Sequence, residues 1–395
     1  MKESHFQLLI LSPLKRTWGV KMKSVKIIAI SILVTIIIGL SILLVLGING
    51  GIRFYGGGMV QSGGDGWTYG STLQNTTSLE ADGITKLEVD YNKTPFTIYF
   101  EVADDDKITV EEFFSKSVSD NKMAKITMSD SQLTIKQQYN TDTNSFLDNI
   151  SGYIFIYLPA DIFESLKDID VVTTSGEIWF SEWAFTETNC LENISLSTTS
   201  GDIRLENMKA ENVKLTSTSG EIDTGIITGD IVVSTTSGDQ EIEEVHGAVS
   251  MRSVSGELKA GKIFGDLDMS TTSGDQKIEW AEGSLEMGTT SGELKVDMLR
   301  GNGNFNSSSG DVRVIVEELT GDLKVRSISG EITINLPPDS GFYFKANTVS
   351  GDISTSYDEQ LTFNKKGKEA EGTVGGSSQY EIKMSTTSGD IKVRQ

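Results

Sequence analysis

Cysteine and histidine are almost absent from this chain. Its 395 residues include one cysteine, Cys190, and two histidines, His5 and His246. A lone cysteine excludes an internal disulfide, and there is no cysteine cluster for a zinc or iron–sulfur centre. Proline is also scarce, with five residues, whereas glycine is abundant, with 40. With few helical patterns beyond the N-terminal segment, this composition predicts an all-β protein without a cofactor.

Basic residues are outnumbered by acidic ones, 34 to 56, and they are distributed unevenly along the chain. The formal net charge is −22 at pH 7, although the first 26 residues are basic. The remainder is therefore even more acidic. A surface of this kind repels phosphate backbones, which argues against nucleic acid as a partner. It suits an extracellular body, or one that attracts cations and basic partners.

One long apolar run, from Ile27 to Ile48, contains no charged residue. As a helix it would be about 33 Å long, enough to cross a hydrocarbon core of about 30 Å. Because lysines and arginines precede the run, the positive-inside rule predicts a cytoplasmic segment 1–26, a membrane-spanning signal anchor 27–48 and an extracytoplasmic remainder. A cleaved signal peptide is the alternative, but no Ala-x-Ala site follows the run. Met22 is an alternative start.

Two segments separate this anchor from the repeats described below. Residues 49–80 are rich in Gly, Ser and Thr and predict a flexible linker. Residues 81–165 contain alternating apolar and polar residues, as in Leu87–Tyr91 and Phe96–Phe100, with long connections. This pattern predicts a β-rich capping region at the end of a repeat array.

The rest of the chain repeats one short motif, Ser-Gly-Asp or Ser-Gly-Glu. Its glycines are at positions 176, 201, 220, 238, 256, 274, 292, 310, 330, 351 and 389. From Gly220 to Gly310 the step is 18 residues each time, and Ser234–Lys259 closely match Ser270–Lys295, which indicates duplication of a 36-residue double repeat. A fixed short period indicates units that pack only against their neighbours.

The residue types around each glycine predict strands. The residue five positions before it is always apolar, and the residue three positions before it is always Ser or Thr. A spacing of two places both on one face of a strand, so we expect Thr235 and Thr271 to point inward in stacked hydroxyl columns. The repeated glycines predict corners, where φ is positive or another backbone comes close.

The sequence therefore predicts a parallel β-solenoid of about 18 residues per rung over residues 166–395, with an insertion near 357–383. Its last strand would be Ile391–Arg394, where Lys392 and Arg394 would discourage edge-to-edge pairing.

The acid after each glycine would point outward and stack from rung to rung. Asp239, Asp275 and Asp311 are the candidate cation ligands, since stacked carboxylates repel and calcium would relieve the repulsion. The competing interpretation is a solvated charged face, because a base often follows two residues after the acid. These bases are Arg204, Lys259, Lys277, Lys295, Arg313 and Lys392. We favour this second interpretation.

No residues can be assigned to catalysis. Serines are plentiful, but His246 is the one histidine after the apolar run that could act as a base, and it lies near a corner of a repeat. Polysaccharide-cleaving β-helices gather acids in an irregular groove, whereas these repeats are regular. The sequence favours a protein that is not an enzyme.

Several motifs resemble a known family. They are Tyr157–Ala160 followed by Val171–Ile178, then Asn335–Pro338 followed by Thr348–Ile353, and finally Ser385–Ile391. Residues 84–395 resemble the "putative adhesin" β-strand-repeat family, which is similar to toast-rack domains of membrane-anchored envelope-stress proteins. The resemblance implies an extracytoplasmic β-solenoid and supplies no catalytic residues.

Three functions remain open at this point. The first is an adhesin-like or scaffolding surface protein in the cell membrane, held there by Ile27 to Ile48, with an extracellular protein or glycan as partner. The second is an envelope-stress sensor or regulator that binds another membrane component. The third, least favoured, is a glycan-active enzyme.

Overall fold

The computed structural model describes residues 71–93, 95–138, 150–181, 190–376 and 379–395. All of these residues belong to one compact unit, Thr68–Gln395. Among them, no helix is long and apolar enough to span a membrane. The predicted anchor 27–48 lies outside the described residues.

The described residues form strands and three short 3-10 helices. Before the first repeat glycine come β1 (Thr72–Glu80), β2 (Lys86–Tyr91), β3 (Phe96–Val102), β4 (Lys107–Phe114), η1 (Asp120–Lys122), β5 (Ala124–Ser129), β6 (Gln132–Gln137), β7 (Gly152–Leu158), η2 (Ala160–Glu164) and β8 (Asp168–Thr173). The first half of the repeats contains β9 (Ile178–Phe180), β10 (Leu191–Ser197), β11 (Ile203–Leu205), β12 (Met208–Thr216), β13 (Ile222–Ser234), β14 (Gln240–His246), β15 (Val249–Ser255), β16 (Leu258–Phe264) and β17 (Leu267–Ser273). The second half contains β18 (Gln276–Ser291), β19 (Leu294–Ser309), β20 (Val312–Ser329), β21 (Ile332–Asn335), β22 (Phe342–Ser350), β23 (Ile353–Thr355), η3 (Asp358–Gln360), β24 (Thr362–Phe363), β25 (Glu369–Val374), β26 (Glu381–Ser388) and β27 (Ile391–Arg394).

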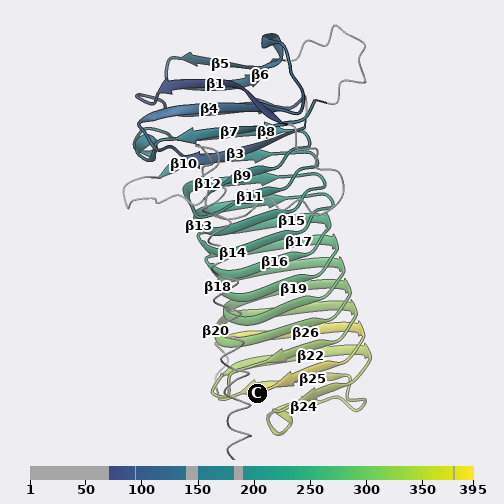
Figure 1. The fold of residues 1–395 in the computed structure, drawn as a ribbon. Coiled ribbons are helices and arrows are strands. Elements are labelled where there is room, and N and C mark those ends of the chain that lie inside the picture. The colour runs from purple at the N-terminus through teal and green to yellow at the C-terminus, as the bar shows by residue number, and fades with distance from the viewer. Residues whose placement is uncertain (1–70, 94, 139–149, 182–189, 377–378) are drawn as a thin grey trace, which may run out of the picture. The chain divides into compact units, whose positions relative to one another are not determined.

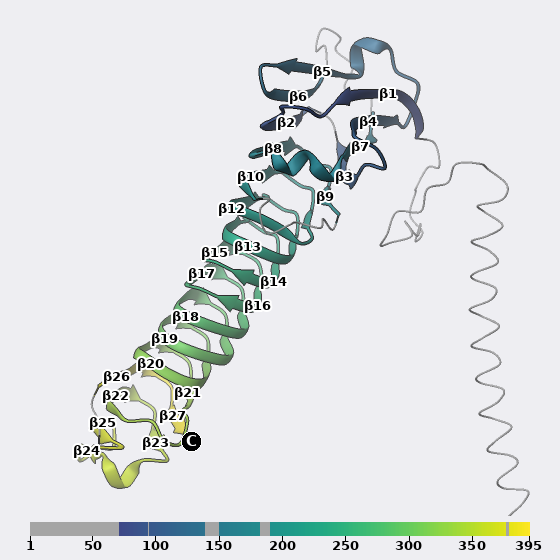
Figure 2. The same ribbon diagram turned by 90° about the vertical axis from the view of Figure 1, so that its left-hand side faces the viewer.

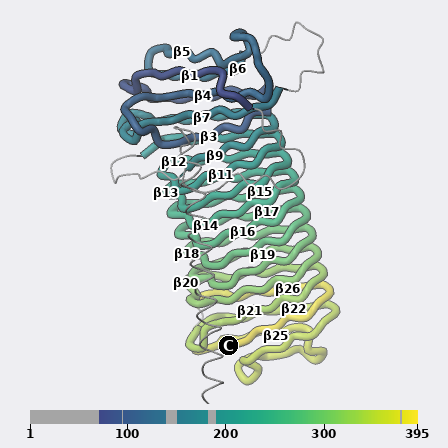
Figure 3. The backbone as a smooth tube through the Cα atoms, in the orientation of Figure 1, coloured from purple at the N-terminus to yellow at the C-terminus, as the bar shows by residue number. Residues whose placement is uncertain are grey.

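Successive rungs stack as parallel strands on two sides of the coil, as Figures 1 and 3 show. We call the sheet whose strands precede each repeat glycine the first sheet, and the sheet whose strands follow it the second sheet. In the first sheet β12 pairs with β13, β13 with β15 and β15 with β17; in the second β11 pairs with β13, β13 with β14 and β14 with β16. The prediction of an all-β solenoid is confirmed for the described residues.

The core is a set of columns made by equivalent residues in successive rungs. The apolar position five residues before each glycine forms one of them: Met251, Met269 and Met287 lie in direct register and are fully buried. Gln240 and Gln276 break the apolar pattern after the glycine, yet both are buried. Gln276 Nε2 donates a hydrogen bond to the Gly288 carbonyl at 2.6 Å, at the other end of β18, whereas its Oε1 has no hydrogen-bond partner within the described residues.

The corners require glycine because the backbones of adjacent rungs nearly touch there. A Cβ on Gly274 would lie 2.0 Å from the carbonyl oxygen of Gly256, and one on Gly256 would lie 2.2 Å from that of Gly238. The second corner is similar, since a Cβ on Gly265 would lie 2.3 Å from the Gly247 oxygen. Close approach of backbone to backbone therefore explains the repeat motif.

The hydroxyl column points inward as predicted, since Thr235 and Thr271 are buried. Its hydrogen bonds differ from the expected hydroxyl-to-hydroxyl chain. Thr235 Oγ1 does bond to Ser253 Oγ at 3.1 Å, but Ser217 Oγ donates to the carbonyl of Gly201 at 3.2 Å. Thr271 Oγ1 has no hydrogen-bond partner in the part of the chain that the structure describes. The close approach at the corner brings a glycine carbonyl within reach, and this carbonyl competes with the neighbouring hydroxyl.

The C-terminal strands do not end the stack. β26 and β27 lie between the rung of β20 and β21 and the rung of β22 and β23, with parallel pairing on both sides. Figure 1 shows β26 as a yellow strand among green ones. The expectation that Ile391–Arg394 is an exposed edge is therefore wrong. The insertion near 357–383 carries the chain out through η3, β24 and β25 and back into the stack.

At the N-terminal end, early strands likewise lie between strands that come later in the sequence. β2 lies between β6 and β8, and β3 lies between β7 and β9, all in parallel. Antiparallel strands then cover the end: β5 on β6, β4 on β7, and β1 on β4. Because Thr72–Glu80 forms β1, the predicted linker 49–80 is wrong over these residues, whose β-branched Thr72, Thr76 and Thr77 suit a strand.

Candidate functional site

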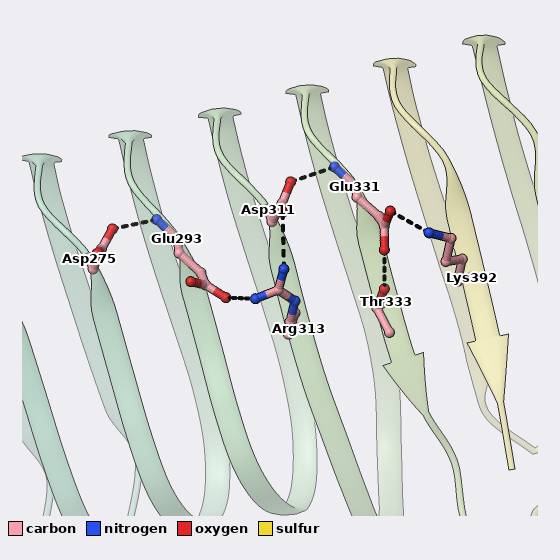
Figure 4. A network of polar contacts seen from close by, with 7 residues as sticks. All are labelled: Asp275, Glu293, Asp311, Arg313, Glu331, Thr333 and Lys392. Carbon is pink, nitrogen blue, oxygen red and sulfur yellow. Dashed lines mark hydrogen bonds and ion pairs between the residues drawn. The ribbon is translucent and has the colours of Figure 1, made fainter.

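The predicted cation ligands are acceptors for the backbone of the next rung. The Oδ1 atoms of Asp239 and Asp275 accept hydrogen bonds from the backbone amides of Glu257 and Glu293, both at 2.8 Å. Asp311 accepts from the amide of Glu331 at 2.9 Å, as Figure 4 shows. The short aspartate reaches the next backbone, and a glutamate follows in each case. This explains the Asp/Glu alternation, which gives the repeat its 36-residue period.

The glutamates of the column contact the bases instead. Lys259 Nζ lies 3.2 Å from Glu257, and Arg313 bridges Glu293 and Asp311. Lys392, on the inserted strand β27, binds Glu331 of the adjacent rung (Figure 4). This hydrogen bond holds the pKa of Glu331 below its ordinary value. Glu257, Glu293 and Glu331 are thus paired with bases within or between rungs.

Two of the predicted compensating bases have other partners. Lys277 lies 3.6 Å from Glu279, and Lys295 lies 2.8 Å from Asp297. Lys259, Lys277, Lys295 and Arg313 are direct neighbours in register, so four like charges stack. Acids on both flanks offset their repulsion, although each exposed pair contributes only about 0–1 kcal/mol.

Acids are in excess in a groove on the second sheet between the rungs of Gly201 and Gly274. The groove has a volume of about 860 Å³, and its lining includes Arg204, Glu221, Asp223, Glu241 and Lys259. Burial raises the pKa of Asp223, although Arg204 opposes the shift, and the Asp223 carboxylate raises the pKa of Glu221. Within the described residues, no group of three His, Cys, Asp or Glu side chains could hold a metal ion.

His246, the one candidate base, lies on the outer surface at the end of β14. Its Nε2 lies 2.9 Å from Glu244 Oε1, and its ring stacks on Phe264 at 4.6 Å. Phe264 in turn lies 4.7 Å from Trp280. Ring stacking along the rungs and the contact with Glu244 occupy this histidine.

Sequence reasoning missed a buried carboxylate in the capping region. Glu112 is fully buried and accepts hydrogen bonds from Tyr91 Oη at 2.8 Å, Asn75 Nδ2 at 2.9 Å and the Ala124 amide at 2.9 Å. These donors come from β2, β1 and β5. Burial raises the pKa of Tyr91 well above its ordinary value. The alternation Ile108, Val110, Phe114 already placed residue 112 inward, so the signal was present.

With this architecture established, comparison with known proteins gives a family. The model of Toastrack DUF4097 matches residues 84–286 and 265–394. The chain belongs to the Toastrack DUF4097 family. This agrees with the resemblance seen in the motifs, and no curated protein matches the chain significantly.

Solved structures match this chain over most of its length at low sequence identity. They include a putative adhesin from Bacteroides fragilis, with 13% identity, coverage of 82% of this chain and 97% of that chain, and a TM-score of 0.29. A putative adhesin from Parabacteroides distasonis has 10% identity, coverage of 81% and 97%, and a TM-score of 0.33. A putative lipid binding protein from the same species has 14% identity, coverage of 83% and 98%, and a TM-score of 0.28. At these TM-scores we draw no functional conclusion from them.

Proposed function

We propose that this Toastrack protein is an adhesin-like or scaffolding surface protein without enzymatic activity. The observation that carries the proposal is the regular stack, in which every rung from β12 to β19 pairs in parallel with the next and places an apolar residue inward at the same position. Such a body presents a long, rigid and repeated surface. In this proposal residues 27–48 hold it on the outer side of the cell membrane, with residues 1–26 in the cytoplasm.

Protease treatment of intact cells tests the location. We expect protease to remove the chain beyond about residue 70 from intact cells, because the repeats lie outside. Protection of the repeats until the cells are lysed would contradict this topology.

An adhesion assay tests the function. Cells that carry the full chain should bind a glycan- or protein-coated surface better than cells that carry residues 1–70 alone. Met269→Asp, which places a charge in the core, should match the truncated form, whereas Ser270→Asp on the outer face should match the full chain. Equal adhesion by all four strains would contradict the proposal.

A second function, sensing of envelope stress by binding another membrane component, is favoured by the groove on the second sheet. Its lining contains more acids than bases, and an acidic lining suits a basic segment of a partner protein. Transcription of envelope-stress genes in a deletion strain separates this function from adhesion: a changed response with unchanged adhesion would favour the sensor.

A further inference from the structure

A second hollow lies at the opposite end of the first sheet from β24. It has a volume of about 480 Å³ and is lined by residues of β5 and β6 and of the nearby turns. Figure 2 shows β5 and β6 side by side at this end. Its lining is Lys93, Asn121, Lys125, Thr127, Thr134, Lys136, Gln137 and Gln138, which includes three lysines and no acid.

The lysines of this hollow repel one another, and a bound anion would reduce this repulsion. Lys125 and Lys136 are direct cross-strand neighbours in the antiparallel pair of β5 and β6. Like charges at such positions destabilise a sheet. Asp90 compensates Lys136, with Nζ and Oδ2 2.6 Å apart. Lys93 and Lys125 are exposed and make no ion pair within the part of the chain that the structure describes.

Neutral hydrogen-bonding groups surround these cations. Thr127 and Thr134 face each other across the same two strands, and Asn121 and Gln138 complete the rim. Hydroxyls and amides both donate and accept, so they match the hydroxyl groups of a sugar. A hollow of this size lies within the range of small-molecule sites, about 300–1,000 Å³.

The hollow contrasts with the rest of the surface, since the chain carries a net charge of −22. Its neighbours in β2, Glu88 and Asp90, are engaged with Gln132 and Lys136 respectively. Lys93 and Lys125 are therefore the cations of the hollow that Asp90 does not offset.

We propose that this hollow binds an acidic saccharide, a sugar that carries a carboxylate, sulfate or phosphate group. Lys93 and Lys125 bind the anionic group, and Thr127, Thr134 and Asn121 bind sugar hydroxyls. The inference rests on the proposed adhesin-like function, to which it adds a class of ligand. The anion also relieves the repulsion between Lys125 and Lys136.

Calorimetric titration of the full-length protein tests the site. The probes are digalacturonate, glucose 6-sulfate and glucose 6-phosphate, with glucose, inorganic phosphate and phosphatidylglycerol vesicles for comparison. We expect at least one acidic sugar to bind, and Lys93→Gln and Lys125→Gln each to weaken it roughly tenfold, since a charge-assisted hydrogen bond is lost. Lys324→Gln, an exposed lysine of the first sheet outside the hollow, is the matched control and should leave binding unchanged.

The other outcomes each contradict the proposal. Equal binding of glucose would show that no anion is recognised, and equal binding of inorganic phosphate would show that no sugar is recognised. Binding of vesicles alone would identify a lipid surface instead. Equal loss in Lys324→Gln would show that only general charge matters.

Adhesion by living cells separates this inference from the proposed function. If Lys93→Gln with Lys125→Gln abolishes binding in solution while cells without the repeats adhere normally, the site stands and the adhesin-like function fails. If the double variant adheres as well as the wild type while the truncated form does not, the function stands and the saccharide site fails.

Discussion

The regular stack and the N-terminal capping region solve the same problem with different interactions. In the stack, each residue contacts its own equivalent one rung away, as the methionine and glycine columns do. In the cap, the contacts are unique: a buried Glu112 joins three strands, and the ring of Phe96 packs 5.1 Å from that of Tyr91 and 5.3 Å from that of Phe114. In a repeat stack each side chain packs on the equivalent side chain of the next rung. The end of the stack has no next rung, so it is closed by contacts between residues that occur only there.

The largest expected effect comes from a charge in the stack core. Met269→Asp should unfold the repeats, because an unpaired carboxylate would lie in a fully buried column. Circular dichroism and thermal melting measure it. Ser270→Asp, one residue away on the outer face, is the control. An unchanged melting temperature for Met269→Asp would refute the inward register.

A smaller but still large effect is expected at the stacked glycines. Gly274→Ala would place a Cβ 2.0 Å from a neighbouring carbonyl, which the backbone can relieve only by moving apart. We expect a loss of about 2–4 kcal/mol, in the range of strained core substitutions. Gly288→Ala is the matched control, since no atom lies within 4 Å of the added Cβ. Equal denaturation midpoints for the two variants would contradict the close approach.

In the cap, the corresponding change is Glu112→Gln. It replaces one acceptor oxygen with a donor that faces the amide of Ala124 and the side chains of Tyr91 and Asn75. A loss of about 1–3 kcal/mol is expected, as for a buried group left unsatisfied. Hydrogen exchange should show the loss in β1, β2, β4 and β5 and not in β14–β19. Glu111→Gln, whose side chain faces outward, is the control. Equal loss of hydrogen-exchange protection throughout the stack would show that the cap and the stack unfold as one cooperative unit.

The smallest effect concerns cations. Because Asp239, Asp275 and Asp311 already bind backbone amides, calcium should raise the melting temperature no more than sodium chloride of equal ionic strength. Melting curves with chelator, calcium and matched sodium chloride measure this. A rise with calcium alone that disappears in the Asp239→Asn, Asp275→Asn double variant would show a binding ladder.

Much of the stack was predictable because each sequence feature recurs in every repeat. The Ser-Gly-acid motif, the apolar position before it and the 18-residue step fix strands, corners and inward faces together. The bonding of the acids was not predictable: whether Asp275 caps Glu293 or binds a cation depends on distances of a few tenths of an ångström between rungs. The position of the last strand was also missed. The residues Ile391–Arg394 match the other repeats, and their sequence does not show that β27 lies between β21 and β23.

Deletion of one double repeat tests the central claim, that the rungs are interchangeable units with a 36-residue period set by the Asp/Glu alternation. Removal of residues 239–274 joins Gly238 to Asp275 and keeps every column, including the aspartate that caps the next glutamate. The account predicts a folded, shorter protein that melts cooperatively with a similar β spectrum, whereas removal of residues 239–265 should unfold it, because strands and corners would fall out of register. Loss of cooperative melting in the 36-residue deletion, or equal stability of the two deletions, would contradict the account.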